Sequence, residues 1–341
     1  MIASREWSDP ASEALSLVEL LRLRASSHGA RTAYTYLLDG EVEESSLTYG
    51  ELDRKARAIA AALQSSCAPG ERALLLYPAG LDYVAALFGC LYARVIAVPA
   101  YPPRPARAHR NMPRLMSVIN DARPAVALSA SASLGAMKRR FDDQPGLLPL
   151  RWIATDEIGD DSAEGWREPE VSGDDLAFLQ YTSGSTSTPK GVMLSHRNLL
   201  HNEQLIRHCF QQTEESVIVG WLPLYHDMGL IGNVLQPLYV GARCVLMSPT
   251  AFLLNPSRWL RAITRYSATT SGGPNFAYDL CVRKISPEQR ARLDLSSWST
   301  AFNGAEPVRH DTMERFAAAF GPCGFRRESF SPCYGLAEAT L

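Results

Sequence analysis

From residue 48 onward the chain alternates short apolar or β-branched runs with segments of helical periodicity, and this alternation constrains the fold more than any other feature. The strand-like runs cover residues 73–77, 95–98, 125–128, 152–154, 176–181, 217–221, 242–247 and 299–303. Continuous apolar strands separated by amphipathic helices are typical of mostly parallel sheets that helices cover on both faces. The sequence therefore predicts an α/β fold, in which ligands bind beyond the carboxyl ends of strands.

The predicted helices have recognisable starts and apolar faces. Thr48 and Glu51 have the spacing of a capping box, which marks the start of a helix. The apolar residues that follow fall on one helical face: Leu52, Ala56, Ile59, Ala60 and Leu63. Further helices are predicted over residues 83–92, 197–210, 256–266 and 308–320. The five prolines within residues 98–113 predict irregular structure there, either a surface connection or a functional loop.

Composition excludes several classes of function. The 341 residues carry 34 Lys and Arg against 36 Asp and Glu, a net charge of −2, whereas nucleic-acid binding needs a basic excess. Seven scattered cysteines without a C-x-x-C pair argue against a disulfide framework or a zinc site. We see no secretory signal, and the apolar stretch 228–242 is too short and too polar to span a membrane. We therefore expect a cytoplasmic protein without a nucleic-acid partner or a transmembrane segment.

The most informative segment is T-S-G-S-T-S-T-P-K-G, residues 182–191, directly after the apolar run 176–181. Backbone N–H groups and hydroxyls of such a loop can wrap phosphate oxygens, while Lys190 supplies a positive charge. The pattern is not a Walker A loop, because Pro189 and Gly191 replace the residues expected on either side of the lysine. A flexible polar loop is the alternative, but its position after a buried strand favours phosphate binding.

Three more clusters follow predicted strands. His226 and Asp227 could orient a carboxylate, although a lone histidine is more often structural. The segment N-G-A-E-P, residues 303–307, carries a glycine that allows a flat ring to approach the backbone. Tyr334 offers a ring for stacking, and Glu338 offers a carboxylate suited to Mg²⁺. Each cluster alone is weak evidence, but their order along the chain is specific.

In this order the sequence resembles the adenylate-forming superfamily of acyl-CoA synthetases, luciferases and nonribosomal-peptide adenylation domains. The resemblance rests on the hydroxyl-rich loop, P-L-Y-H-D-M-G, S-G-G-P-N-F-A-Y-D, N-G-A-E-P and Y-G-L-A-E, and extends from about residue 48 to residue 341. Within the superfamily, A-V-P-A-Y-P-P at residues 97–103 and P-C-Y-G-L-A-E-A-T-L at the C-terminus are similar to fatty acyl-AMP ligases.

The resemblance implies a role for each matching residue. Residues that would contact the ATP phosphates are Thr182, Ser183, Gly184, Ser185, Thr186 and Lys190. Residues that would surround the adenine are Gly304, Ala305, Glu306, Tyr334 and Gly335. Glu338, with Thr186, would hold Mg²⁺. The acyl pocket would be formed by His226, Met228, Gly272, Gly273, Pro274 and Phe276. Of these residues, His226, Lys190 and Glu338 would be catalytic.

The resemblance also implies a fold and an activity. We expect two packed α/β subdomains, residues 51–195 and residues 1–50 plus 196–341. The barrel-like subdomain and the mobile C-terminal domain of relatives are expected to be absent, as in a truncated chain. The implied activity is ATP-dependent conversion of a medium- or long-chain fatty acid to an acyl-adenylate, with release of pyrophosphate, for loading onto an acyl carrier protein. An acyl-CoA synthetase and a catalytically silent module that binds nucleotide or acyl-adenylate remain alternatives.

Overall fold

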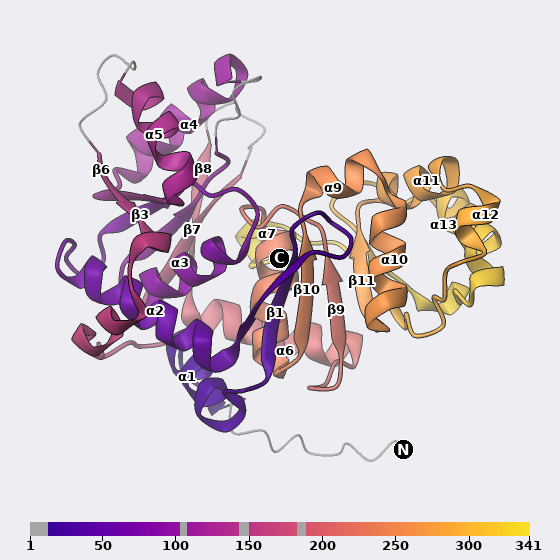
Figure 1. The fold of residues 1–341 in the computed structure, drawn as a ribbon, viewed down its shortest axis with the longest axis horizontal. Helices are drawn as coiled ribbons and strands as arrows, with labels where there is room; N and C mark the ends of the chain where they lie inside the picture. Colours follow the sequence, from indigo (N-terminus) through magenta and orange to yellow (C-terminus); the bar gives the residue numbers. More distant parts are fainter. Residues whose placement is uncertain (1–12, 103–107, 143–149, 183–188) are drawn as a thin grey trace.

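The computed structural model describes residues 13–102, 108–142, 150–182 and 189–341, which form two sheets. The smaller sheet has six strands among the described residues, in the order β6-β5-β3-β4-β7-β8 (Figure 1). Its strands are β3 (Arg72–Leu75), β4 (Ile96–Pro99), β5 (Val126–Ser129), β6 (Arg151–Ala154), β7 (Leu176–Thr182) and β8 (Lys190–Ser195). All pairs are parallel except β7–β8, an antiparallel pair at one edge.

The larger sheet has seven strands in the described part of the chain, in the order β13-β12-β11-β9-β10-β1-β2. They are β1 (Thr32–Leu37), β2 (Glu44–Thr48), β9 (Val217–Gly220), β10 (Arg243–Met247), β11 (Thr270–Gly273), β12 (Thr300–Asn303) and β13 (Phe330–Pro332). Only the β1–β2 pair is antiparallel. The fold class predicted from the sequence, mostly parallel sheets covered by helices, is confirmed.

Helices connect the strands and cover both sheets (Figure 1). The α-helices are α1 (Leu17–His28), α2 (Tyr49–Gln64), α3 (Leu81–Tyr92), α4 (Ala108–Ala122), α5 (Ser131–Asp142), α6 (His196–Phe210), α7 (Asp227–Leu230), α8 (Gln236–Val240), α9 (Pro249–Leu254), α10 (Ser257–Tyr266), α11 (Asn275–Lys284), α12 (Pro287–Arg290) and α13 (His310–Phe320). A π-helical turn, Ile231–Leu235, joins α7 to α8. Short 3₁₀ turns cover Thr155–Glu157, Asp160–Gly165, Gly321–Cys323, Arg327–Ser329 and Ala337–Ala339.

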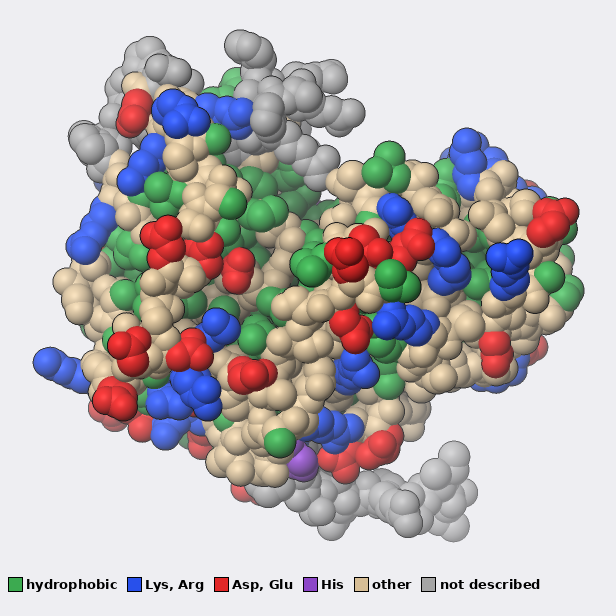
Figure 2. Space-filling model, in the orientation of Figure 1, with side chains coloured by type: hydrophobic (Ala, Val, Ile, Leu, Met, Phe, Trp, Pro, Cys, Tyr) green, Lys and Arg blue, Asp and Glu red, His purple; other side chains and the backbone are tan. Residues whose placement is uncertain are grey.

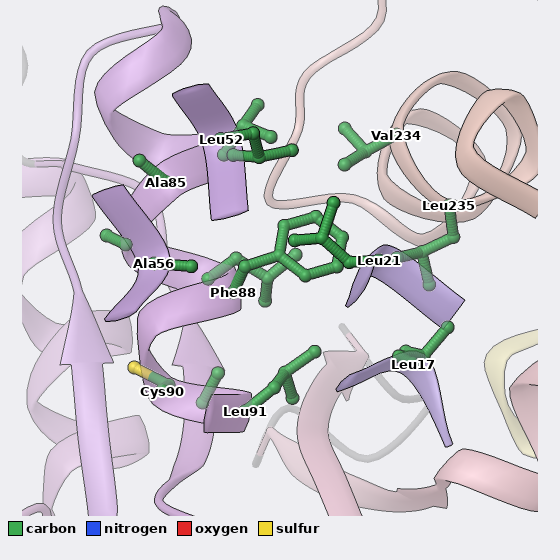
Figure 3. Packing of buried hydrophobic residues seen from close by; sticks show 14 of the residues in the cluster. Leu17, Leu21, Leu52, Ala56, Ala85, Phe88, Cys90, Leu91, Val234 and Leu235 are labelled. Carbon is green, nitrogen blue, oxygen red and sulfur yellow. The ribbon is translucent and has the colours of Figure 1, made fainter. Parts of the chain in front are cut away.

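A continuous apolar core joins the two sheets. Helices α1, α2 and α3 pack against the segment formed by the π-helical turn and α8 (Figure 3). The ring of Phe88, fully buried, lies among Leu21, Leu52 and Val234 in this layer. Close packing of this kind resists relative movement of the layers, because apolar side chains cannot separate without exposing their surface to water.

Local sequence signals account for much of this arrangement. The predicted capping box is confirmed: the Thr48 side chain accepts from the Glu51 N–H, and the Glu51 carboxylate accepts from the Thr48 N–H. The predicted apolar face of α2 is buried, and its residues are Leu52, Ala56, Ile59, Ala60 and Leu63. Acidic and basic side chains are interspersed on the face shown in Figure 2. No helix in the described ranges combines the length and the apolarity that crossing a bilayer requires.

The expectation of irregular structure throughout residues 98–113 was wrong at both ends. Pro99 is the last residue of β4, and α4 begins at Ala108, so that Pro113 lies inside a helix. A proline in the second turn removes only one intrahelical hydrogen bond. The apolar face of α4 compensates for this loss by packing against the small sheet through Met112, Leu115, Val118, Ile119 and Ala122.

Candidate functional site

A cavity of about 1020 Å³ lies where the carboxyl ends of both sheets meet. Strand ends contribute Pro99, the last residue of β4, Thr182, the last residue of β7, Ala305 beyond β12 and Cys333 directly after β13. Most of the remaining lining comes from α4, α6, the segment 225–236 and the C-terminal residues 334–341. The cavity therefore occupies the position in which open α/β sheets bind their ligands.

The hydroxyl-rich loop begins and ends beside this cavity. Thr182 lines the cavity and pairs with Lys190 across the antiparallel β7–β8 ladder. The Lys190 side chain is exposed, forms no ion pair with a described residue and does not line the cavity. The remaining predicted loop residues lie outside the described residues: Ser183, Gly184, Ser185 and Thr186.

His226 and Asp227 form an ion pair on the cavity wall, with 2.6 Å between His226 Nδ1 and Asp227 Oδ1. The hydrogen bond to Asp227 raises the pKa of His226, although burial and the charge of Arg114 oppose this shift. Burial disfavours ionisation of Asp227, but hydrogen bonds from His226 and the Met228 N–H lower the pKa of its carboxyl overall. The histidine side chain is 57% exposed and the aspartate 15%, so the imidazole faces the cavity.

Arg114 brings positive charge to the same region. It is the only lysine or arginine among the described residues that line the cavity, and it forms no ion pair with them. Its charge lowers the pKa of His226, which lines the same cavity. Its helix is fixed to β7 by a hydrogen bond of 2.6 Å from the Tyr181 hydroxyl to the Asp121 carboxylate.

A second group of predicted residues forms another part of the cavity wall. Ala305, with a positive φ of 64°, follows β12, and Tyr334 is 89% exposed with its ring free for stacking. Gly335 and Glu338 also line the cavity, and the exposed Glu338 carboxylate forms no ion pair with a described residue.

Two predicted adenine-contacting residues lie behind this wall. Gly304 packs closely on Cys333, because a Cβ at Gly304 would lie 2.6 Å from the Cys333 sulfur. The Glu306 carboxylate accepts a hydrogen bond of 2.6 Å from the Phe276 N–H. Neither residue lines the cavity.

The predicted acyl-pocket residues divide in a similar way. Met228 lines the cavity beside His226, whereas four residues do not: Gly272, Gly273, Pro274 and Phe276. A Cβ at Gly272 would lie 2.1 Å from the Phe302 carbonyl oxygen, and one at Gly273 would lie 2.5 Å from the Trp221 ring. These glycines therefore allow the side chains behind the cavity to pack closely on the sheet.

Sequence reasoning missed the apolar end of the cavity. Phe210 and Phe302 stack there with ring centroids 6.2 Å apart and planes inclined by 9°. Leu205 and Ile206 add further apolar surface from α6. Polar residues missed in the same cavity include Gln180, Asn202, Gln212, Gln236 and Thr270. Gln180, inside the predicted strand 176–181, had a positional signal, but the others depend on how α6 packs against the sheet.

Comparison with known families gives this geometry a context. Residues 21–341 match the AMP-binding enzyme family. The chain belongs to this family. The match covers both sheets and every described wall of the cavity.

Similar curated proteins are fatty-acid ligases. The chain is 51% identical over 327 residues to the medium-chain-fatty-acid–[acyl-carrier-protein] ligase JamA of Moorena producens, covering 96% of this chain and 55% of that protein. It is 38% identical over 336 residues to the long-chain-fatty-acid–AMP ligase FadD23 of Mycobacterium tuberculosis, covering 96% of this chain and 57% of that protein. The chain thus spans little more than half the length of these relatives.

Solved structures show the same fold. A fatty acyl-adenylate ligase from L. pneumophila, determined in complex with acyl adenylate and pyrophosphate, superposes with a TM-score of 0.90 at 47% identity. The superposition covers 97% of this chain and 57% of that one. The adenylation domain of a keto acid-selecting nonribosomal peptide synthetase module, 22% identical with a TM-score of 0.85, shares the fold.

Proposed function

We propose that the protein activates a medium- or long-chain fatty acid by forming an acyl-adenylate from ATP, with release of pyrophosphate. One observation carries this proposal: the lining of a single cavity contains an exposed aromatic ring, a carboxylate, a histidine paired with an aspartate and two stacked apolar rings. A nucleotide, a carboxylate and an alkyl chain would each meet suitable chemistry there. The names of JamA and FadD23, both fatty-acid ligases, support the same activity.

We infer that the nucleotide lies against Tyr334 and Ala305. The exposed ring would stack on the adenine, and the backbone around Ala305 and Gly335 would border its edge. The phosphates would then point toward the end of β7, where Thr182 faces the cavity and Lys190 lies across the ladder. In this arrangement the Thr182 hydroxyl would meet the phosphates, and Lys190 would turn inward to meet their charge.

The chemistry requires two anions to approach each other. An oxygen of the acyl carboxylate forms a bond to the α-phosphorus of ATP, while the bond from that phosphorus to the pyrophosphate oxygen breaks. His226, whose positive charge Asp227 favours, would attract and orient the carboxylate. Arg114 and Lys190 would stabilise the charge that accumulates on the departing pyrophosphate.

Relatives of this kind imply Mg²⁺, and the described residues fit such an ion. Glu338 offers a carboxylate that no described residue neutralises, and Thr182 offers a hydroxyl on the same cavity. One carboxylate together with substrate phosphates is a common way for proteins to hold Mg²⁺. The ion would supply positive charge to the phosphate oxygens when bound. Thr186, the second ligand predicted from the sequence, lies outside the described residues.

We further propose that the activated acyl group is loaded onto an acyl carrier protein in lipid, polyketide or lipopeptide biosynthesis. The name of JamA states a carrier-protein acceptor for that protein. A transfer assay with CoA and with holo-acyl carrier protein distinguishes a carrier-protein ligase from an acyl-CoA synthetase.

We also propose that the chain divides into subdomains 51–195 and 1–50 plus 196–341, because β3–β8 and the remaining strands form separate sheets.

Mass spectrometry of the products formed from ATP and a panel of fatty acids tests the central reaction. We expect acyl-adenylate and pyrophosphate in equal amounts with at least one medium- or long-chain acid. Calorimetry with acyl-sulfamoyl adenosine, a non-reactive mimic of the acyl-adenylate, should accompany the assay. Binding of the mimic without turnover would favour a catalytically silent binding module, and neither binding nor product would refute the proposal.

A further inference from the structure

Part of the cavity lining is polar and lies near the amino edge of the large sheet, opposite the carboxyl edge. Thr270, which lines the cavity, is the first residue of β11 and is aligned with Thr300, whereas Gly273 is aligned with Asn303 at the carboxyl edge. Thr270 and Gly273 are three residues apart along β11, which corresponds to about 10 Å. Thr270 therefore lies about 10 Å from the carboxyl edge of the sheet, where the nucleotide is proposed to bind. Gln212, five residues before β9, lines the cavity near the same amino edge. We call Gln212, Gln236 and Thr270 the polar floor.

The amides of the floor belong to a buried hydrogen-bonded chain. Gln236 and Gln212 bond to each other through their amide groups, with 2.6 Å between the bonded atoms. With its amide oriented to satisfy both ends, Gln236 donates to the main-chain oxygen of Glu203 at 3.0 Å and to its carboxyl at 2.5 Å. Gln236 and Glu203 are fully buried, and Gln212 is 3% exposed. These contacts hold the floor in one geometry.

One amide end of Gln212 remains without a partner. In this orientation of Gln236 the Gln212 amide N–H donates to the Gln236 oxygen, and no described residue bonds to the Gln212 carbonyl oxygen. The side chain is nearly buried and faces the cavity, so the unpaired group has only the cavity contents to bond. A buried amide that loses its partner costs about 1–3 kcal/mol, whereas a ligand that satisfies it recovers that energy.

The surroundings indicate the kind of ligand group that fits. Burial raises the pKa of the Glu203 carboxyl and so favours its neutral form, which does not call for a cationic ligand. Phe210 and Phe302 stack in the same lining, and Leu205 and Ile206 of α6 also line it. The cavity therefore offers both apolar surface and the polar floor to a ligand.

We propose that the preferred substrate is a medium-chain acid that carries an uncharged hydrogen-bond donor, such as a hydroxyl, at or near its distal end, where the Gln212 carbonyl oxygen accepts its hydrogen bond. This inference rests on the proposed function, because it names the class of acid that the same site activates. The carboxylate meets His226, the methylene chain lies along the phenylalanine pair and the distal group completes the hydrogen bonding of the floor. A plain alkyl acid of equal length leaves the Gln212 amide unpaired against a methyl group.

The test compares acids of equal chain length in the ATP-dependent release of pyrophosphate. Nonanoic acid is paired with 8-hydroxyoctanoic acid, and decanoic acid with 9-hydroxynonanoic acid. In the pair whose length reaches the floor, we expect kcat/KM to be about tenfold higher for the hydroxy acid than for the plain acid. One neutral hydrogen bond contributes about this factor. Gln212→Leu should abolish or reverse this preference, because the leucine removes the amide and keeps a similar volume.

Matched variants separate the floor from general effects. Gln204→Leu makes the same exchange at an exposed position of α6 outside the cavity and should keep the preference. Thr270→Val removes a hydroxyl of the floor with little change in shape, and it provides a second reading should Gln212→Leu fail to fold. Preference for the plain acid at every length, or an unchanged preference in both floor variants, would overturn the inference while the proposed function stands. Absence of pyrophosphate release with every acid would instead refute the proposed function, and this inference with it.

Discussion

Replacing Glu203 with glutamine should change how stability depends on pH. Glu203 is fully buried on α6, and burial raises the pKa of its carboxyl well above the ordinary value of 4.5. The folded chain therefore retains a proton that the unfolded chain releases above that pH. In this range the free energy of unfolding falls by about 1.4 kcal/mol per pH unit for one such group. From about pH 5.5 to pH 7 the wild-type protein therefore loses at most roughly 2 kcal/mol of unfolding free energy through this group. The Glu203→Gln variant does not lose it, because glutamine does not titrate.

Urea denaturation followed by tryptophan fluorescence measures this difference. The Glu203→Gln variant should gain stability relative to the wild-type protein as the pH rises over that interval, while other titrating groups cancel in the comparison. Glu215→Gln makes the same exchange at an exposed position between α6 and β9, keeps Glu203 in place, and serves as the matched control. A difference between Glu203→Gln and wild type that stays constant with pH would refute a protonated, buried Glu203.

The other predictions concern the site and the sheet behind it. Lys190→Ala and Glu338→Ala should each slow pyrophosphate release about a hundredfold, or roughly 3 kcal/mol, and wild-type rates would exclude these roles. His226→Ala should raise KM for the acid; the wild-type KM should also rise as the pH passes the raised pKa of His226, where the imidazolium loses its charge. An unchanged KM with a lower melting temperature would indicate a structural histidine. Gly272→Ala should destabilise the fold by about 1–3 kcal/mol in thermal denaturation, because its Cβ meets the Phe302 carbonyl; an unchanged melting temperature would show that the sheet adjusts.

The apolar runs predicted most of the buried strands in the described part of the chain, but not β1. Residues 73–77 correspond to β3, for example, and residues 242–247 to β10. Strand β11 was missed because Thr270–Gly273 consists of small residues, which the close approach of Phe302 and Trp221 requires. Pro113 was misinterpreted because its effect on α4 depends on its place in the second turn and on tertiary packing.

Part of the candidate site followed from position after a strand. Thr182, His226 and Tyr334 were selected for that reason, and all three line the cavity. The polar floor could not be predicted in this way. Gln212 and Gln236 become neighbours only when α6 packs beside α8, and a buried pair of amides has no signature in a single sequence.

A crystal structure of the protein with acyl-sulfamoyl adenosine tests the central claim most directly, since one ligand carries the adenine, the acyl linkage and the alkyl chain. We predict the adenine against Tyr334, the acyl carbonyl beside His226 and the alkyl chain along Phe210 and Phe302 toward Gln212. A ligand bound outside this cavity, or with its alkyl chain directed away from the stacked rings, would contradict the account.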